Sequence, residues 1–338
     1  MAGSRQFRLA AHPVGDVKES DFELVEEPVP DPGDGEFVVE VTHISVDPAM
    51  RGWMNAGRSY IAPVEIGEVM RAMGLGRVIT SRHPEFGEND IVQGTFGVRE
   101  HTLSDGAGVH KVSPVDGVSL AAYLGVLGMT GLTAYFGLLE VGRMRAGDTV
   151  LVSGAAGAVG TAVGQIAKIK EGRVVGIAGG PEKCGMLVKE LGFDAAVDYK
   201  ADEFHDQLRR HTPDEVDVFF DNVGGQVLDM GLTRLARGAR VVICGAVSQY
   251  NSTTGMTGPS NYIMLLVARA SMTGFVVFDF AERYGEAVAE LSRWLSEGRI
   301  RSVEDTVRAD IESFPSMLGR LFAGSNTGKL VLELESGA

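Results

Sequence analysis

The chain has 338 residues, of which 44% are hydrophobic and 22% charged, so it is long enough for two ordinary folded domains. Its formal net charge of −14, with no basic block to offset it, argues against nucleic acid or an anionic membrane as the main partner. Its two cysteines, Cys184 and Cys244, are too few for a disulfide framework, and the N-terminus lacks an apolar signal core, so we expect a cytoplasmic protein. The longest apolar segments, such as 118–139, are broken by glycines and polar residues and do not predict a transmembrane helix.

The first 120 residues contain short β-forming runs separated by glycine and proline. These runs span residues 7–10, 22–27, 36–46, 74–81, 90–98 and 110–112. Short strands with such punctuation are typical of a small barrel. We therefore expect a β-rich domain with a partly open barrel.

A different pattern begins near residue 121. An Ala/Leu-rich helical segment (121–142) leads into strands that alternate with helices, including expected helices at 181–191, 203–210 and 227–236 and a strand at 240–246. Such alternation predicts right-handed βαβ units and a parallel, doubly wound sheet. The tail, with a helix expected at 281–297 and a final strand at 329–334, returns to mixed character.

These patterns predict an α/β protein of two domains. The β-rich domain comprises residues 1–125 and 300–338, and the doubly wound (Rossmann) domain comprises residues 126–299. A crevice between two such domains is where a cofactor and a substrate could meet.

The segment 149–160, T-V-L-V-S-G-A-A-G-A-V-G, has the order strand, tight loop, helix that a dinucleotide fingerprint requires. Ala155, Gly157 and Gly160 fall on the three glycine positions, with Ala155 in place of the first. The helix N-terminus that follows offers N–H groups and a partial positive charge to a pyrophosphate. A tight βα turn in some other α/β protein is the alternative.

The end of the second strand favours NADP over NAD. An NAD site has an acidic residue there for the ribose 2′-hydroxyl, whereas this chain has Ile177-Ala178-Gly179-Gly180. Lys183 could face a 2′-phosphate as a point charge, and Tyr199 could supply a hydroxyl to it. The alternative for Lys183 is a solvated surface lysine.

Ordered motifs along nearly the whole chain match one family. They are D-P-A-M-R-G-W-M (47–54), Y-I-A-P-V-E-I-G-E-V-M (60–70), L-G-M-T-G-L-T-A-Y-F-G-L (127–138), F-D-N-V-G-G (220–225), C-G-A-V-S-Q-Y-N (244–251), G-F-V-V (274–277) and N-T-G-K-L-V-L (326–332). The chain resembles the zinc-independent medium-chain dehydrogenase/reductases. Within them it is similar to the group of prostaglandin reductase/leukotriene B4 12-hydroxydehydrogenase, plant double-bond reductases and curcumin-reductase-like bacterial enzymes. This resemblance implies a GroES-like β-rich domain, NADPH/NADP as the cofactor and a homodimer.

The resemblance also implies which residues form the cofactor shell. They are Ala156, Gly157, Ala158, Val159, Gly160, Gly179, Lys183, Tyr199, Asn222, Cys244, Gly245, Ala246, Ser248, Tyr250, Phe275, Val276, Val277 and Asn326. Independently of it, Asn222 and Cys244 follow the fourth and fifth strands of the doubly wound domain, at the carboxyl edge where such sheets bind ligands. We expect Cys244 to contribute position and backbone rather than thiol chemistry.

No catalytic metal is expected. Zinc-dependent members of the superfamily carry G-H-E where this chain has Gly67-Glu68 without the histidine, and two cysteines cannot build a four-cysteine site. Without a Lewis acid, hydride addition to an alkene conjugated with a carbonyl asks less of a protein than alcohol–carbonyl interconversion, because the charge spreads into an enolate.

Tyr250 is the candidate hydrogen-bond donor to that enolate, and cofactor positioning alone is its alternative role. Tyr60, Met50 and Tyr262 are candidate substrate residues, with packing as the alternative for each. One departure from many relatives is the segment 97–101, which lacks their tryptophan and could reshape the pocket wall.

The sequence thus predicts an NADPH-dependent reductase of the C=C bond of α,β-unsaturated ketones or aldehydes. A quinone reductase is the alternative among enzymes, and an NADPH-binding structural or sensor protein is the alternative outside them.

Overall fold

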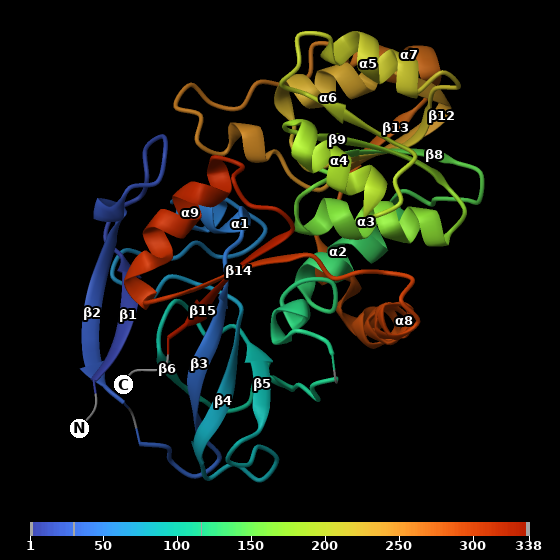
Figure 1. The fold of residues 1–338 in the computed structure, drawn as a ribbon. Helices are drawn as coiled ribbons and strands as arrows, with labels where there is room; N and C mark the ends of the chain where they lie inside the picture. The colour runs from blue at the N-terminus through green and yellow to red at the C-terminus, as the bar shows by residue number, and fades with distance from the viewer. Residues whose placement is uncertain (1–2, 30, 116, 336–338) are drawn as a thin grey trace. The chain divides into compact units, whose positions relative to one another are not determined.

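The computed structural model describes residues 3–29, 31–115 and 117–335, and the chain divides into two compact units. The central unit is residues 125–303, and the terminal unit combines residues 1–124 with 304–338. In Figure 1 the central unit runs from green to orange, and the terminal unit is blue to cyan with a red C-terminal part.

The central unit, which the structure describes without a gap, is built on a six-stranded parallel sheet of order β10-β9-β8-β11-β12-β13. The strands are β8 Thr149–Ser153, β9 Arg173–Ala178, β10 Ala195–Asp198, β11 Val216–Asp221, β12 Leu235–Ile243 and β13 Ser271–Gly274. From β8 the chain winds outward to one edge, returns to β11 beside β8, and winds outward to the other edge. This is the doubly wound order, and its switch point lies between β8 and β11.

Helices cover both faces of this sheet. They are α2 Met129–Phe136, α3 Ala158–Ile169, α4 Pro181–Lys189, α5 Phe204–His211, α6 Gly225–Leu232, α7 Ile263–Ala268 and α8 Tyr284–Ser296. Figure 1 shows α5, α6 and α7 along one face and α2 and α3 along the other. Apolar residues of α5 and α6 such as Leu208 and Leu232 are buried in one core cluster with Val175 and Phe219 of the sheet, so the amphipathic helices bury their apolar faces on it.

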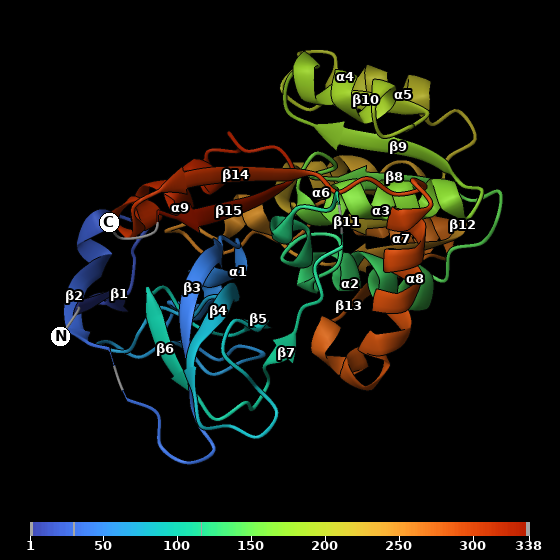
Figure 2. The ribbon, with the colours of Figure 1, turned by 60° about the horizontal axis from the view of Figure 1, so that its bottom comes forward.

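The described part of the terminal unit contains a mixed seven-stranded sheet and a separate antiparallel pair. The pair is β1 Gly3–Leu9 and β2 Phe22–Pro28, and the sheet is formed by β3 Phe37–Ser45, β4 Gly74–Ser81, β5 Ile91–Gly94, β6 His101–Ser104, β7 His110–Lys111, β14 Glu304–Ala309 and β15 Lys329–Leu334. One edge of β3 is shared by β6 along its first half and β15 along its second half. Figure 2 shows β14 and β15 side by side, so the C-terminal segment completes a domain that the N-terminal segment begins.

One hydrophobic core joins the strands of the terminal unit with its two helices, α1 Ala49–Trp53 and α9 Phe314–Phe322, among the described residues. Phe7, Phe22 and Phe314 pack their rings together with centroids 5.4 to 6.0 Å apart. These contacts between chain ends explain why the β-rich domain needs both termini. The predicted fold class, a doubly wound sheet plus a β-rich domain, is confirmed.

The structure differs locally from the expectations in three respects. The helix expected at 227–236 ends at Leu232, and β12 already begins at Leu235 because sheet pairing with Val216 overrides the helical pattern there. The helix expected at 281–297 begins at Tyr284, after a 3₁₀ segment. The short helices α1 and α7 were not expected. None of the described helices is long and apolar enough to cross a membrane.

Candidate nucleotide and substrate site

The loop after β8 turns on Gly154 rather than on the first fingerprint position. Gly154 has φ of +58°, where glycine is favoured, whereas Ala155 is fully buried and its N–H bonds the Ile177 carbonyl at 3.0 Å. A Cβ on Gly160 would lie 2.3 Å from the Gly154 oxygen, so only glycine lets α3 pack this closely on the turn. The small residues at the first and third positions therefore act through packing.

The first turn of α3 is open to an anion. Its N-cap is Gly157, which has no side chain to bond the first N–H groups. Ala158 and Val159 follow it and are partly exposed, whereas Ala156 is buried. The donors of this helix end and its positive dipole therefore suit a pyrophosphate, as the fingerprint predicts.

A buried carboxylate joins the two strands at the switch point. Asp221, at the end of β11, accepts hydrogen bonds from the Ser153 hydroxyl at 2.6 Å and from the N–H groups of Val223 at 3.2 Å and Gly224 at 2.9 Å. The Asn222 side-chain amide donates to the Ser153 carbonyl at 2.7 Å. Burial raises the pKa of Asp221, and the three donors oppose that shift. Ser153 and Asp221 were not expected as site residues, although both lie within the motifs 149–160 and 220–225.

The loop after β12 is bonded to the loop after β11. The Cys244 N–H donates to the Asp221 carbonyl at 2.9 Å, and the Ser248 hydroxyl donates to the Val223 carbonyl at 2.7 Å. The structure thus brings Asn222 and the segment 244–250 together at the carboxyl edge of the sheet. Burial raises the pKa of the Cys244 thiol to about 12, so it stays protonated near neutral pH.

Tyr250 folds back onto this loop. Its hydroxyl oxygen accepts the Ala246 N–H at 3.1 Å, and a Cβ on Gly245 would lie 2.9 Å from that oxygen. Gly245 therefore leaves room for the phenol, and the backbone orients the hydroxyl. A phenol whose oxygen accepts a backbone N–H still carries its own O–H donor.

A second corner forms at the ends of β9 and β10. The Tyr199 ring packs on Gly179, where a Cβ would lie 2.9 Å from it, and Lys183 is half-buried in the first turn of α4. Lys200, which was not expected as a site residue, places its ammonium 5.9 Å from the Tyr199 ring centre. The carboxylate of Asp198, the last residue of β10, accepts hydrogen bonds at 2.9 Å from the N–H groups of Gly180 and Lys200. It therefore holds the backbone that follows β9 and β10 in place. Two lysines and a tyrosine at one corner suit a 2′-phosphate.

The segment after β13 lies in the same unit. The Phe275 ring meets Phe220 of β11 edge to face at 6.4 Å between centroids. Val276 is partly exposed, and Val277 is buried and accepts the Tyr284 hydroxyl at 3.1 Å. Tyr262, in contrast, is 64% exposed just before α7.

The other predicted site residues belong to the terminal unit. Met50 is fully buried in the core of that unit, so packing accounts for its position. Tyr60 is 55% exposed, and its hydroxyl accepts the Trp53 indole N–H at 3.2 Å. Asn326 is buried and donates to the Gly328 carbonyl at 2.9 Å.

The segment 97–101, where the chain departs from many relatives, leads into β6 and packs beside β1. Val98 is fully buried, and its N–H bonds the Met70 carbonyl at 2.8 Å. The Glu100 carboxylate forms an ion pair with the Arg5 guanidinium at 2.6 Å, and Arg5 also forms an ion pair with Asp310. These contacts give the segment a packing role.

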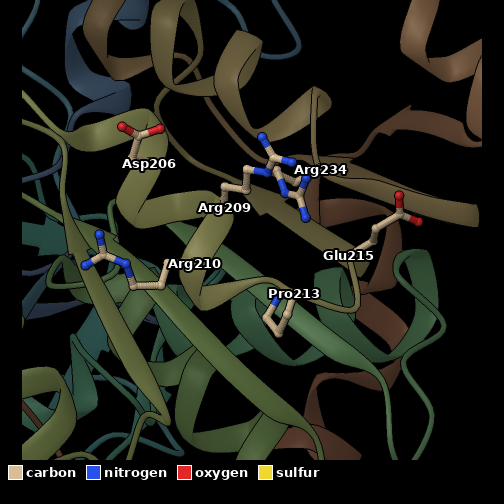
Figure 3. Close-up of a pocket in the computed structure, with 6 residues that line it drawn as sticks. All are labelled: Asp206, Arg209, Arg210, Pro213, Glu215 and Arg234. Carbon is tan, nitrogen blue, oxygen red and sulfur yellow. The ribbon is translucent and has the colours of Figure 1, made fainter.

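A surface hollow of about 540 Å³ lies elsewhere on the central unit. It is lined by Asp206, Arg209, Arg210, Pro213, Glu215 and Arg234 (Figure 3). Glu215 and Arg234 directly precede β11 and β12, so the hollow lies at the amino edge of the sheet, opposite the fingerprint loop. The Arg234 guanidinium is bonded to the Thr212 hydroxyl at 2.9 Å, which gives it a structural role.

Among residues 3–29, 31–115 and 117–335, no group of three or more His, Cys, Asp or Glu side chains is placed to hold a metal ion. Residues 5–112 match a family model described as the N-terminal domain of oxidoreductase, and residues 158–293 match one described as zinc-binding dehydrogenase.

The chain also resembles characterised proteins over nearly its whole length. It is 38% identical over 341 residues to the NADPH-dependent curcumin reductase of Escherichia coli, with 98% of this chain and 97% of that protein covered. It is 37% identical over 336 residues to the NADP(+)-dependent 2-alkenal reductase of Nicotiana tabacum, with 97% of each covered. The crystal structure of CurA in complex with NADPH from Vibrio vulnificus matches with a TM-score of 0.93 at 40% identity, over 98% of this chain and 100% of that one. On this similarity the chain belongs to the zinc-independent medium-chain dehydrogenase/reductases, in their group of double-bond reductases.

Proposed function

We propose that this enzyme reduces the C=C bond of α,β-unsaturated ketones and aldehydes, with hydride transfer from NADPH to the β-carbon. Its membership of the double-bond reductases carries the reaction class. The donor set of the central unit supports the cofactor, because the open first turn of α3 and the Lys183, Tyr199 and Lys200 corner suit a diphosphate and a 2′-phosphate.

Tyr250 stabilises the negative charge that develops on the substrate oxygen. Hydrogen bonding to an enolate oxygen lowers the barrier when the donor is already oriented. The Ala246 N–H holds the Tyr250 oxygen at 3.1 Å, which supplies that orientation without consuming the hydroxyl proton. The phenol serves as a hydrogen-bond donor in this proposal, and the α-carbon proton comes by way of water or a cofactor hydroxyl.

The direct test is NADPH oxidation at 340 nm with a panel of enones, 2-alkenals and naphthoquinone. We expect turnover of the conjugated carbonyls and weaker turnover of the quinone. Replacing Tyr250 with Phe should lower kcat by about 10²-fold while NADPH still binds. An unchanged kcat would remove Tyr250 from the reaction, and NADPH binding without turnover of any enone would refute the activity.

The cofactor corner has its own test. Lys183→Ala should raise the KM for NADPH about 10- to 100-fold and leave that for NADH nearly unchanged, since one charge-assisted bond to the 2′-phosphate is lost. Lys200→Ala should act in the same direction. Equal effects on both cofactors would contradict a 2′-phosphate role, and Lys189→Ala, on the same helix at its far end, is the control.

We also infer a homodimer formed through the β13 edge of the central unit. All four residues of β13 are exposed, and β12 is its one partner in the sheet. Met272 of β13 is 39% exposed, and four apolar residues of the preceding α7 and its N-cap are 51% to 72% exposed, namely Tyr262, Ile263, Leu266 and Val267. An open strand edge with an apolar border suits a second copy, because antiparallel pairing about a two-fold axis extends the sheet and covers the border.

Light scattering after size exclusion tests this interface. Leu266→Glu combined with Met272→Lys should convert the dimer to a monomer, whereas Val188→Glu, an apolar-to-acidic change at an exposed position of α4, should not. A monomeric wild type would refute the dimer.

A cytoplasmic location stays a prediction, with which the two free cysteines agree.

A further inference from the structure

Two buried cations hold the segment 46–55 of the terminal unit. Among the described residues of that unit, Lys329 and Arg51 are the cationic side chains that are almost fully buried, at 2% and 4% exposure. Arg51 lies inside the segment and donates to the Pro13 carbonyl at 2.9 Å and to the Asn55 side chain at 2.5 Å. Lys329 reaches it from β15, more than 280 positions away.

The Lys329 ammonium binds the start of the segment at two points. It donates to the Val46 carbonyl at 2.9 Å and to the Asp47 carboxylate at 2.7 Å. The other Asp47 oxygen accepts the Ser45 hydroxyl. The Val46 N–H donates to the Leu330 carbonyl at 3.1 Å. The turn after β3 is therefore bonded to β15 both by the Lys329 side chain and by the backbone.

Stability alone is a weak reason for this arrangement. Removing an ammonium from water is costly, and apolar residues of similar volume often stabilise a core as well as a buried ion pair does. An ion pair, unlike an apolar contact, is directional and fixes the backbone to which it bonds. The main effect of the Lys329–Asp47 pair is therefore to fix the position of the turn after β3.

The position of the turn determines the position of an exposed tyrosine, Tyr60. The Asp47 carbonyl accepts the Met50 N–H at 3.1 Å at the start of α1, and α1 ends at Trp53. The Trp53 indole donates to the Tyr60 hydroxyl at 3.2 Å, and its carbonyl accepts the Val64 N–H at 2.8 Å. The exposed Tyr60 is thus held by α1, which the ion pair anchors.

The same lysine lies close to the other proposed ligand-binding residue of this unit. Asn326 is three positions before Lys329, and it is tied to this strand start by its bond to Gly328 at 2.9 Å. Gly328 has φ of +70°, so the chain turns sharply between Asn326 and Lys329. A shift of Lys329 would therefore move the Asn326 loop and the 46–50 turn together.

We propose that Lys329 is a positioning residue that sets both the substrate side (Tyr60, through Asp47 and α1) and the cofactor side (Asn326) of the terminal unit. The proposal rests on the proposed function and on the ligand-binding roles of Tyr60 and Asn326 that are expected from the sequence. Lys329, which is 2% exposed and bonded to Val46 and Asp47, acts in this proposal through its neighbours rather than by contact with a ligand.

The test compares Lys329→Met and Asp47→Asn with a matched control, Arg5→Met. Arg5 also joins distant parts of the terminal unit by ion pairs, to Glu100 and Asp310, but it contacts neither the 46–50 turn nor the Asn326 loop. Fluorescence titration with NADPH gives the active fraction and the dissociation constant, and steady-state kinetics with an enone give kcat and both KM values. Hydrogen exchange reports the amides of residues 46–64 independently of activity.

A positioning role predicts that both KM values rise about tenfold in Lys329→Met and Asp47→Asn, since small misplacements weaken binding and reaction strongly. It also predicts faster exchange over residues 46–64, and Arg5→Met should lose thermal stability with unchanged KM values. If the two variants merely have a smaller active fraction, with both KM values and the exchange of 46–64 unchanged, the proposal is wrong.

Asp47→Asn decides the matter if Lys329→Met does not fold, because it keeps the shape and the acceptor oxygen. If the wild type turns over no enone, the proposed function fails, while the NADPH dissociation constants and the exchange rates still judge the positioning role.

Discussion

Two carboxylates, one in each unit, stand at similar points of the chain and have different partners. Asp221 of the central unit and Asp47 of the terminal unit both stand at or just after a strand end, and both accept a serine hydroxyl. Asp221 is otherwise bonded by backbone N–H groups two and three residues further along. Asp47 is bonded by Lys329, 282 positions away.

The difference separates local from long-range organisation. The Asp221 arrangement is built into F-D-N-V-G-G, because glycines let the chain turn its N–H groups toward the carboxylate. The Asp47 arrangement exists only when the C-terminal strand is in place beside β3. The switch point of the central unit is therefore preorganised by its own loop, and the 46–50 turn depends on the complete fold.

The largest expected effect is on the long-range pair. Asp47→Asn should reduce the free energy of unfolding by about 3 kcal/mol, because it leaves the Lys329 ammonium buried without a counter-charge. Chemical denaturation of the variant and the wild type measures this difference. A loss below that of Asp221→Asn would reverse the comparison.

Asp221→Asn should cost about 2 kcal/mol, because an amide presents donors to a site lined with donors. It should also weaken NADPH binding, since Ser153, Asn222 and the 244–250 loop are all bonded to this residue or next to it. Denaturation and NADPH titration measure the two effects. Ser153→Ala removes one of the donors, so a smaller loss is expected of it, and an equal loss would show that Asp221 acts through Ser153 alone.

The smallest effect concerns a third acid, Glu304, whose pKa burial raises to about 7. The folded state keeps this proton up to about pH 7, whereas the unfolded chain releases it near 4.5, so stability falls as the pH rises between these values. The full shift would be worth about 2.5 kcal/mol between pH 5 and pH 8, but Glu304 is only partly buried, so Glu304→Gln should remove about 1 kcal/mol of the wild type's loss of stability. Unfolding midpoints of both proteins at the two pH values test this, and identical pH dependences would contradict it.

Much of the structure of the central unit could be predicted because its sequence signals are local. Strands alternating with helices predicted the doubly wound sheet, and the 149–160 segment predicted the turn into α3. The predicted residues of the 244–250 loop and Asn222 lie together because parallel strands end at one edge. The exchange of roles between Ala155 and Gly154, and the contribution of Lys200, depend on dihedral angles and side-chain directions that periodicity does not contain.

By itself the sequence determined the class of the fold, the family and the preference for NADP, because βαβ periodicity, small-residue loops and the Gly179-Gly180 strand end act over a few residues. Only the tertiary structure decided that Asp221 fastens the switch point, that Met50 is core, and that Lys329 meets Asp47. These facts join residues far apart along the chain, and long-range partners are chosen by packing and charge burial rather than by local propensity.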